Sequence, residues 1–288
     1  MSERVSVVLP VYGPSPHLPV CLASIGPNAD EIVVVDDGGP EPCPWVVDHD
    51  PRVIYIRQDN AGVSAARNRG VLAASGDIVF FLDQDDVFEP DKIAIVVSRM
   101  QECGAAFAYS AFHIIDEHGE RQGEGWGRLV GYEEMLAGNT GIQLSALAVT
   151  RATFSRTGLF DPDLRFAGDQ QMALQLLRGE VGCFVDADLM GYRLHADNAS
   201  HKHRKVASEM FAIWSAERVH CSSGAERRAR RAGVKVLRQL YGCQAHEAAA
   251  SALERRDARV LVREVGWLVR HDPVGSARRL ARRLARRG

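Results

Sequence analysis

The chain has 288 residues, of which 46% are hydrophobic and 25% are charged, a composition typical of a soluble globular protein with its own core. The net charge of −2 conceals an asymmetry, because residues 1–203 carry 15 Lys and Arg against 29 Asp and Glu, whereas residues 204–288 carry 20 against 8. We therefore expect an acidic body joined to a basic C-terminal segment, of the kind that usually meets an anionic partner.

The expected compartment is the cytoplasm. None of the six cysteines forms a C-x-x-C pair, and a chain of this length does not need disulfides, so we expect reduced and mostly buried thiols. The N-terminus lacks the layout of a signal peptide, and no apolar run reaches the roughly 20 residues of a membrane span.

Short apolar strands alternate with helices in the first third of the chain. Strands are expected at residues 5–10, 31–37, 53–57 and 77–83, and helices at about 18–25, 64–74 and 90–103. This alternation predicts a doubly wound α/β sheet that is mostly parallel. The next part is mixed, with strands expected at 105–115, 143–150, 181–187 and 189–194, a loop at 119–131 and a helix at 170–177. From about residue 205 onward the pattern is helical.

Carboxylates follow two of the expected strands. Asp36 and Asp37 end the second strand, and Asp83-Gln84-Asp85-Asp86 ends the fourth. Ligands of such sheets bind beyond the carboxyl ends of the strands, so these residues predict a ligand site. Alternate residues of a strand point the same way, so Asp83 and Asp85 are expected to reach one pocket and to offer oxygen ligands to Mg²⁺ or Mn²⁺. A solvated acidic turn, or a cap on the following helix, is the structural alternative.

Four segments appear in a characteristic order: Val7–Tyr12 (VVLPVY), Val34–Gly38 (VVDDG), Asn60–Gly70 (NAGVSAARNRG) and Phe81–Asp86 (FLDQDD). Over about residues 4–200 the chain resembles the inverting glycosyltransferases with the GT-A fold, usually called family 2. The resemblance implies a Rossmann-like, mixed and mostly parallel sheet flanked by helices. Residues 1–204 would form the nucleotide-sugar-binding and catalytic domain, and residues 205–288 a basic helical C-terminal extension.

The resemblance also implies roles around the nucleotide. Asp37 matches the residue that hydrogen-bonds the base, and Pro10 and Tyr12 would line the same pocket. Arg67 matches the arginine of the A-R-N segment near the nucleotide, although a salt bridge to Asp36 or Asp83 is an equal alternative.

The remaining donor-side roles fall on the acidic motif and on a later histidine. Asp83 would approach the ribose or the metal, Gln84 would lie beside the donor, and Asp85 would be the principal metal ligand. His195 lies in Tyr192–Ser200 (YRLHADNAS), which resembles a Y-R-x-H-x-x-N-x-S stretch whose histidine joins the metal or contacts the diphosphate; a structural histidine is the alternative.

The proposed base comes from a separate segment. Gly158–Met172 (GLFDPDLRFAGDQQM) resembles a G-x-F-D-x-x-L stretch followed by Glu-Asp at a helix start, where the Asp is the usual catalytic base. This implies that Asp169 is the base. Gly168 replaces the expected Glu, a departure that puts acceptor binding in doubt, and a simple N-cap is the alternative role of Asp169.

The implied reaction moves a sugar from a nucleotide-diphosphate sugar to a hydroxyl of a glycan, lipid-linked or small-molecule acceptor, with Mn²⁺ or Mg²⁺ as cofactor. UDP-sugars are the commonest donors of such enzymes, with dTDP- and GDP-sugars left open. A non-catalytic or weakly active nucleotide-sugar-binding protein is one alternative. A nucleotidyltransferase is another, although the loop at 11–16 lacks the basic residue expected there.

The C-terminal residues 277–288 repeat Leu-Ala-Arg-Arg, which places Leu and Ala on one helical face and arginines on the rest. One interpretation is an interfacial helix on anionic lipid, which would place the protein peripherally on the inner face of the membrane. The alternatives are a helix packed on the acidic body or a frayed tail. Nucleic acid is not an expected partner, because the carboxylates at the strand ends would repel phosphate.

Overall fold

The computed structural model describes residues 3–139, 141–195, 198, 202–272 and 275–276. The chain divides into two compact units. Unit 1 comprises Met1–Gly131 and Thr140–Asp197, and unit 2 comprises Tyr132–Asn139 and Asn198–Gly288. The short segment Tyr132–Asn139 therefore belongs with the C-terminal helices, although it is separated from them by about 60 residues of sequence.

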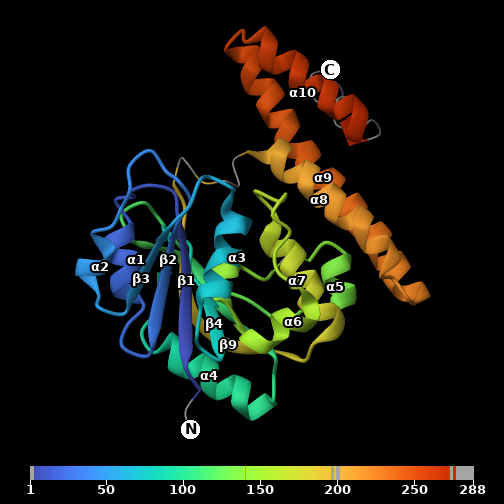
Figure 1. Ribbon diagram of the computed structural model, residues 1–288. Helices are drawn as coiled ribbons and strands as arrows, with labels where there is room; N and C mark the ends of the chain where they lie inside the picture. Colours follow the sequence, from blue (N-terminus) through green and yellow to red (C-terminus); the bar gives the residue numbers. More distant parts are fainter. Residues whose placement is uncertain (1–2, 140, 196–197, 199–201, 273–274, 277–288) are drawn as a thin grey trace. The chain divides into compact units, whose positions relative to one another are not determined.

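Unit 1 is built on a mixed sheet whose described strands run in the order β3-β2-β1-β4-β8-β6-β9-β5, with β7 paired to β6. Figure 1 shows the strands β1 to β4 side by side. The strands are β1 (Val5–Val11), β2 (Glu31–Asp36), β3 (Val53–Arg57), β4 (Ile78–Phe81), β5 (Val87–Phe88), β6 (Phe107–Ile115), β7 (Arg121–Trp126), β8 (Leu147–Thr150) and β9 (Gly182–Arg193). Strands β3, β2, β1 and β4 pair in parallel, and so do β6 and β9. Strands β5, β7 and β8 add antiparallel pairings. The predicted mixed sheet is confirmed, and its continuous parallel part is the N-terminal half.

Helices cover both faces of this sheet. They are α1 (Leu18–Ser24), α2 (Val46–His49), α3 (Val63–Ala73), α4 (Lys92–Cys103), α6 (Phe154–Thr157) and α7 (Gly168–Gly179). Side chains alternate along β1, so Val7 joins one core cluster with Leu22 of α1 and Val96 of α4. Val8 points to the opposite face, where it meets Gly70 of α3 so closely that a Cβ on Gly70 would collide with it. Strands β1, β2 and β4 are buried on both faces, which explains their continuous apolar sequences, whereas the edge strand β3 is only partly buried.

The structure corrects three expectations for the middle of the chain. The expected loop at 119–131 contains strand β7, whose residues are polar and mostly exposed, so no alternation of apolar residues indicated it. The two short strands expected at 181–187 and 189–194 form one long strand, β9. The strand expected at 143–150 begins as a 3₁₀ turn at Leu144–Ala146 before β8. All six cysteines are described and none of them forms a disulfide; Cys103 and Cys243 are exposed and the other four are buried.

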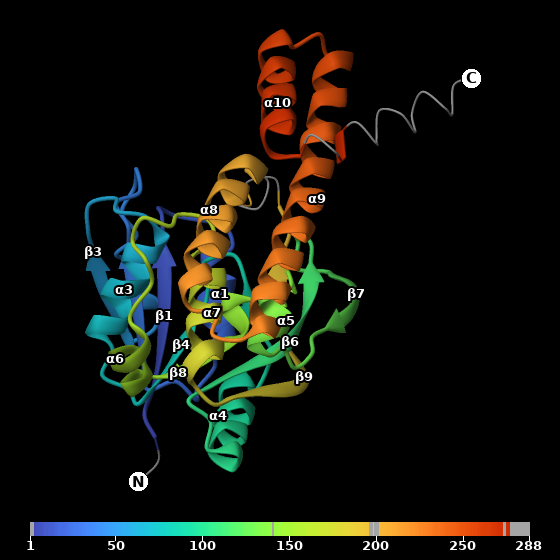
Figure 2. The same ribbon diagram turned by 90° about the vertical axis from the view of Figure 1, so that its right-hand side faces the viewer.

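Unit 2 is helical and contains α5 (Tyr132–Leu136), α8 (His203–Ala216), the 3₁₀ turn η4 (Glu217–Val219), α9 (Gly224–Glu254) and α10 (Ala258–His271). Trp214 is fully buried and its Nε1 donates to the Leu136 carbonyl at 2.8 Å, which ties α8 to α5. Ser223 and Glu226 form a capping box at the start of α9, and α10 turns back beside the end of α9 (Figure 2). The predicted C-terminal helices are confirmed. No described helix is long and apolar enough to span a membrane.

Candidate active site

All nine residues predicted to form the site lie in unit 1. They come from the ends of β1, β2 and β4, from α3, from the start of α7 and from the segment after β9. The four parallel strands bring their carboxyl ends to one edge of the sheet, which is why residues far apart in sequence can form one site there.

The two aspartates at the end of β2 have different surroundings. Asp36 is fully buried and accepts hydrogen bonds from the Tyr55 hydroxyl (2.5 Å) and from Arg57 (2.6 Å). Burial raises the pKa of Asp36, but these hydrogen bonds outweigh it, so the net shift is downward and the group stays ionised. Asp37 turns the other way and accepts from the backbone N–H groups of Ala61 (2.9 Å) and Gly62 (2.8 Å). Asp36 is thus a structural anchor, whereas Asp37 orders the loop that leads into α3.

The predicted nucleotide-pocket residues lie at the ends of the neighbouring strands β1 and β2. The backbone N–H of Tyr12 donates to Gln84 Oε1 at 3.0 Å, so the end of β1 is joined directly to the acidic motif. The Tyr12 side chain is 56% exposed and therefore accessible to a ligand, whereas Pro10 is buried within β1. A Cβ on Gly39 would collide with the backbone of Gly13, so only glycine permits the two loops to approach this closely.

The acidic motif forms a turn rather than an extended strand end. Strand β4 ends at Phe81 and the Asp86 N–H donates to the Asp83 carbonyl at 3.1 Å, so the strand alternation used to align Asp83 with Asp85 does not extend to these residues. The turn is held from inside by Ser145, whose hydroxyl accepts from the Asp83 N–H (3.1 Å) and donates to Asp86 (2.6 Å). Asp86 is only 2% exposed, and burial raises the pKa of its carboxyl well above the ordinary range. Asp86 is therefore an internal support of the turn.

The two partly exposed carboxylates of the turn, Asp83 and Asp85, engage different partners. Asp83 Oδ1 accepts from Arg67 at 2.7 Å, which is the salt bridge considered as an alternative for this arginine. Asp85 Oδ2 lies 2.7 Å from His195 Nε2. The ring centre of His17 lies 5.6 Å from that of His195. The pKa of His17 is lowered, mainly by burial. The sequence patterns did not single out His17, because it follows a loop with no recognised motif.

A buried arginine fixes the backbone of the turn. Arg193 is 3% exposed; its Nε donates to the Asp85 carbonyl at 2.7 Å, and its backbone N–H donates to Asp86 Oδ1 at 3.0 Å. It lies at the end of β9, two residues before His195, so this strand positions both the turn and the imidazole. Among the described residues no three His, Cys, Asp or Glu side chains converge as a ready metal cage.

Asp169 is the second residue of α7 and is half-buried. It does not cap this helix, because the N-cap position is Ala167 and no side chain caps it. Asp169 instead accepts from the backbone N–H of Gln170 (2.8 Å) and from the Gln170 side chain (3.1 Å). Burial raises the pKa of Asp169; Arg67 and the Gln170 hydrogen bonds oppose the rise, and Asp83 adds to it. Arg67 thus acts electrostatically on Asp83 and on Asp169.

The structure explains why glycine precedes Asp169. A Cβ on Gly168 would lie 2.5 Å from Ser64 Oγ, and that hydroxyl is committed to the Leu164 carbonyl at 2.5 Å. The start of α7 is therefore packed directly on the start of α3, and a glutamate at position 168 would have to displace Ser64. The missing glutamate follows from this close packing.

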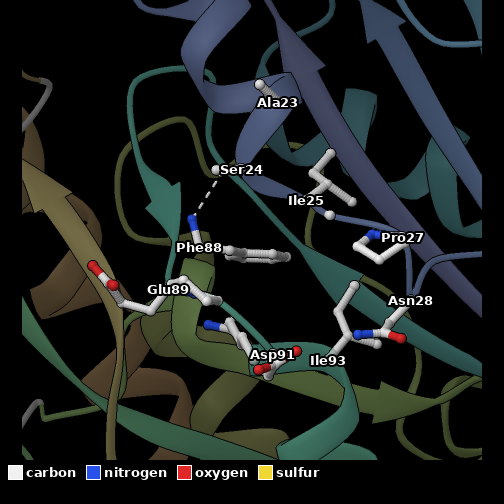
Figure 3. Close-up of a pocket in the computed structure, with 12 residues that line it drawn as sticks. Ala23, Ser24, Ile25, Pro27, Asn28, Phe88, Glu89, Asp91 and Ile93 are labelled. Carbon is white, nitrogen blue, oxygen red and sulfur yellow. Dashed lines mark hydrogen bonds between the residues drawn. The ribbon is translucent and has the colours of Figure 1, made fainter.

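A separate hollow of about 290 Å³ lies between the end of α1 and the segment from β5 into α4 (Figure 3). The Ser24 hydroxyl accepts from the Phe88 N–H at 3.0 Å beside it. Its lining residues are 23–28 and 88–93, and none of the predicted site residues is among them. We therefore assign no part of the chemistry to this hollow.

Comparison with known proteins identifies the class. Residues 6–159 match the family model described as glycosyl transferase family 2, and because this is more than half of the chain, the protein belongs to that family. It is 36% identical over 124 residues to glycosyltransferase GlyA of Streptococcus pneumoniae, covering 41% of this chain and 18% of that protein. It is 26% identical over 215 residues to chondroitin synthase of Escherichia coli, covering 71% of this chain and 31% of that protein. The match thus spans about a fifth of the length of the first of these relatives.

The fold has a counterpart among solved structures. The crystal structure of S. aureus TarS 1-349 superposes with a TM-score of 0.57 at 15% identity, covering 90% of this chain and 89% of that one. Structures of the same protein with UDP and with UDP-GlcNAc match similarly. At this identity the likeness establishes the fold, and the chain has the GT-A fold with additional C-terminal helices.

Proposed function

We propose that this protein is an inverting glycosyltransferase that moves a sugar from a UDP-sugar to a hydroxyl group of a glycan, lipid-linked or small-molecule acceptor. The observation that carries the proposal is the relation of Asp169 to Arg67 and Asp83. The half-buried Asp169, whose pKa is raised by burial, interacts electrostatically with Arg67, and Arg67 Nη2 donates to Asp83 Oδ1 of the acidic turn at 2.7 Å. The site therefore contains a carboxylate suited to accept a proton and, apart from it, a set of groups suited to hold a diphosphate.

The donor would bind along the strand ends. Asp37 and the exposed Tyr12 ring, at the ends of neighbouring strands, would hold the uracil base and ribose, and the UDP and UDP-GlcNAc complexes of TarS support a nucleotide-sugar of this kind. Arg67 Nε has no hydrogen-bond partner among the described residues, so the buried guanidinium keeps one unused donor, which we assign to a phosphate oxygen of the bound donor.

The chemistry is a single displacement. The acceptor hydroxyl oxygen attacks the anomeric carbon from the face opposite the diphosphate, and Asp169 takes the hydroxyl proton as the new bond forms. The bond between the anomeric carbon and the phosphate oxygen breaks, and UDP leaves with the electron pair. Arg67 stabilises the negative charge that develops on the leaving diphosphate. Configuration at the anomeric carbon is therefore inverted.

The residues of the acidic turn fit a divalent ion whose coordination would be completed by the phosphates of the donor. Asp85 and His195 offer an oxygen and a nitrogen 2.7 Å apart, whereas Asp83 is committed to Arg67. Mg²⁺ is commonly held by one or two carboxylates together with substrate phosphates, so Asp85 and His195 would hold Mn²⁺ or Mg²⁺ here. When bound, the ion would neutralise charge on the diphosphate.

Thermal unfolding with a panel of nucleotide sugars tests the donor. We expect a UDP-sugar with MnCl₂ to raise the melting temperature by about 5 °C or more at about 100 times its dissociation constant. Asp85→Ala should remove the part of this shift that depends on manganese. A full panel of UDP-, GDP- and dTDP-sugars without any shift would contradict the proposal, and a shift without turnover of the donor would indicate a binding protein rather than an enzyme.

A further inference from the structure

Helix α10 has a fixed inner face that contains a buried carboxylate. Glu264 is 1% exposed and is paired with Arg204 Nε (3.1 Å) and His203 Nε2 (3.2 Å), both at the start of α8. Leu268 is 4% exposed on the same face, and one turn further on the His271 ring stacks on Phe211 of α8, with ring centres 5.7 Å apart. Helix α10 also packs along α9. These contacts determine which side of α10 is turned outward.

The outward side of α10 is apolar. Val262, Val265 and Val269 are spaced by three and four residues and are 72%, 45% and 66% exposed. This spacing places them on one side of the helix, away from Glu264 and Leu268. A charged residue thus faces inward while three valines face solvent, which is the reverse of the usual arrangement and indicates an interaction surface. We call Val262, Val265 and Val269 the valine face.

Arginines flank the valine face. Arg259, Arg263 and Arg270 are exposed and follow one another at intervals of four and seven residues, which aligns them along one edge of the helix beside the valines; Arg263 Nη2 also lies 3.6 Å from Glu264 Oε1. The segment from residue 204 onward also carries 20 Lys and Arg against 8 Asp and Glu. An apolar strip with a cationic edge is complementary to a layer whose outer surface is anionic and whose interior is hydrocarbon.

We propose that the valine face of α10 lies in the interface of an anionic lipid membrane, with the flanking arginines at the headgroups. This inference does not depend on the identity of the sugar donor. It differs from the expectation drawn from the arginine repeat, since residues 277–288 lie outside the described residues and α10 carries the surface. Membrane binding through α10 would hold the enzyme at a surface where lipid-linked acceptors are found.

Vesicle sedimentation of the full-length protein tests the proposal. We expect binding to vesicles of phosphatidylcholine with phosphatidylglycerol, weaker binding to phosphatidylcholine alone, and a marked loss at high salt. The triple variant Val262→Ser, Val265→Ser, Val269→Ser should bind anionic vesicles at least about tenfold more weakly. It should keep wild-type helicity and wild-type hydrolysis of UDP-sugar, because these side chains are exposed and belong to unit 2.

A matched control carries serine at three exposed valines elsewhere, Val47, Val181 and Val219, which are 44%, 64% and 76% exposed. This control should bind vesicles like the wild type. Equal binding of the valine-face variant and the wild type would overturn the proposal. So would a concentration-dependent dimer, detected by sedimentation velocity without lipid, that is abolished by the valine-face substitutions, because the face would then bind a second copy of the chain.

Discussion

Gln170 offers a direct test of how the proposed base is tuned. Its side chain is 8% exposed, and its Nε2 donates to Asp169 Oδ2 at 3.1 Å. This hydrogen bond favours the ionised carboxylate and so lowers the pKa of Asp169 against the effect of burial. Gln170→Leu removes the donor while keeping the approximate volume and leaving the backbone hydrogen bond to Asp169 in place.

The expected magnitude follows from the strength of one hydrogen bond to a charged group, about 1.5–3 kcal/mol. Loss of the bond raises the pKa of Asp169, so fewer molecules hold the base ionised at acid pH. We expect kcat/KM to fall about tenfold or more on the acid side of the profile and to approach the wild-type value as the pH rises and Asp169 ionises fully.

The assay is the pH dependence of kcat/KM for hydrolysis of the UDP-sugar, with water as the acceptor so that no further substrate is needed. Gln171→Leu is the matched control, because Gln171 contacts the Asp161 backbone rather than the base. An acid limb that stays at the wild-type pH in Gln170→Leu would refute the reasoning. A loss of equal size at every pH would also refute it, because that would indicate damage to the fold of the site.

Two further predictions concern packing and the acidic turn. Gly70→Ala should destabilise the protein by about 1–3 kcal/mol in urea unfolding, because the new Cβ collides with Val8. Adding Val8→Ala to the same chain should restore part of that loss. An unchanged urea midpoint in Gly70→Ala alone would contradict the close packing of Gly70 on Val8. Ser145→Ala should cost about 1–3 kcal/mol, since buried Asp86 loses its hydroxyl donor, and isothermal titration should show weaker manganese-dependent UDP-sugar binding. Ser110→Ala is the control, because Ser110 is buried with no hydrogen-bond partner for its hydroxyl in the described structure, and equal effects of the two serine variants would contradict the role of Ser145.

Most of the parallel half of the sheet could be predicted because β1, β2 and β4 are buried on both faces and are therefore continuously apolar. The carboxylates at the ends of β2 and β4 were recognisable because they follow directly on these apolar runs. Strand β7 could not be predicted, because its exposed sequence Arg121–Trp126 contains glycine and charged residues and its pairing depends on β6, which precedes it in the chain.

The finer geometry of the site depends on contacts between residues far apart in sequence. Ser145 supports a turn 60 residues earlier, and Arg193 holds the same turn from more than 100 residues later. The local pattern of Asp83 to Asp86 indicated an extended strand end, whereas these tertiary hydrogen bonds hold it as a turn. The glycine at position 168 could not be explained from the local sequence either, because the side chain that leaves no room for a larger residue is Ser64 on another helix.

The most direct test of the central claim is ¹H NMR of UDP-sugar hydrolysis, followed from the first turnover in the wild type and in Asp169→Asn. An α-linked donor should release the sugar first as the β anomer, because water attacks from the face opposite the diphosphate. Asp169→Asn should lower that rate by about 100-fold or more while UDP-sugar affinity is retained. Initial release of the α anomer would contradict inversion, and a near wild-type rate in Asp169→Asn would contradict the assignment of Asp169 as the base.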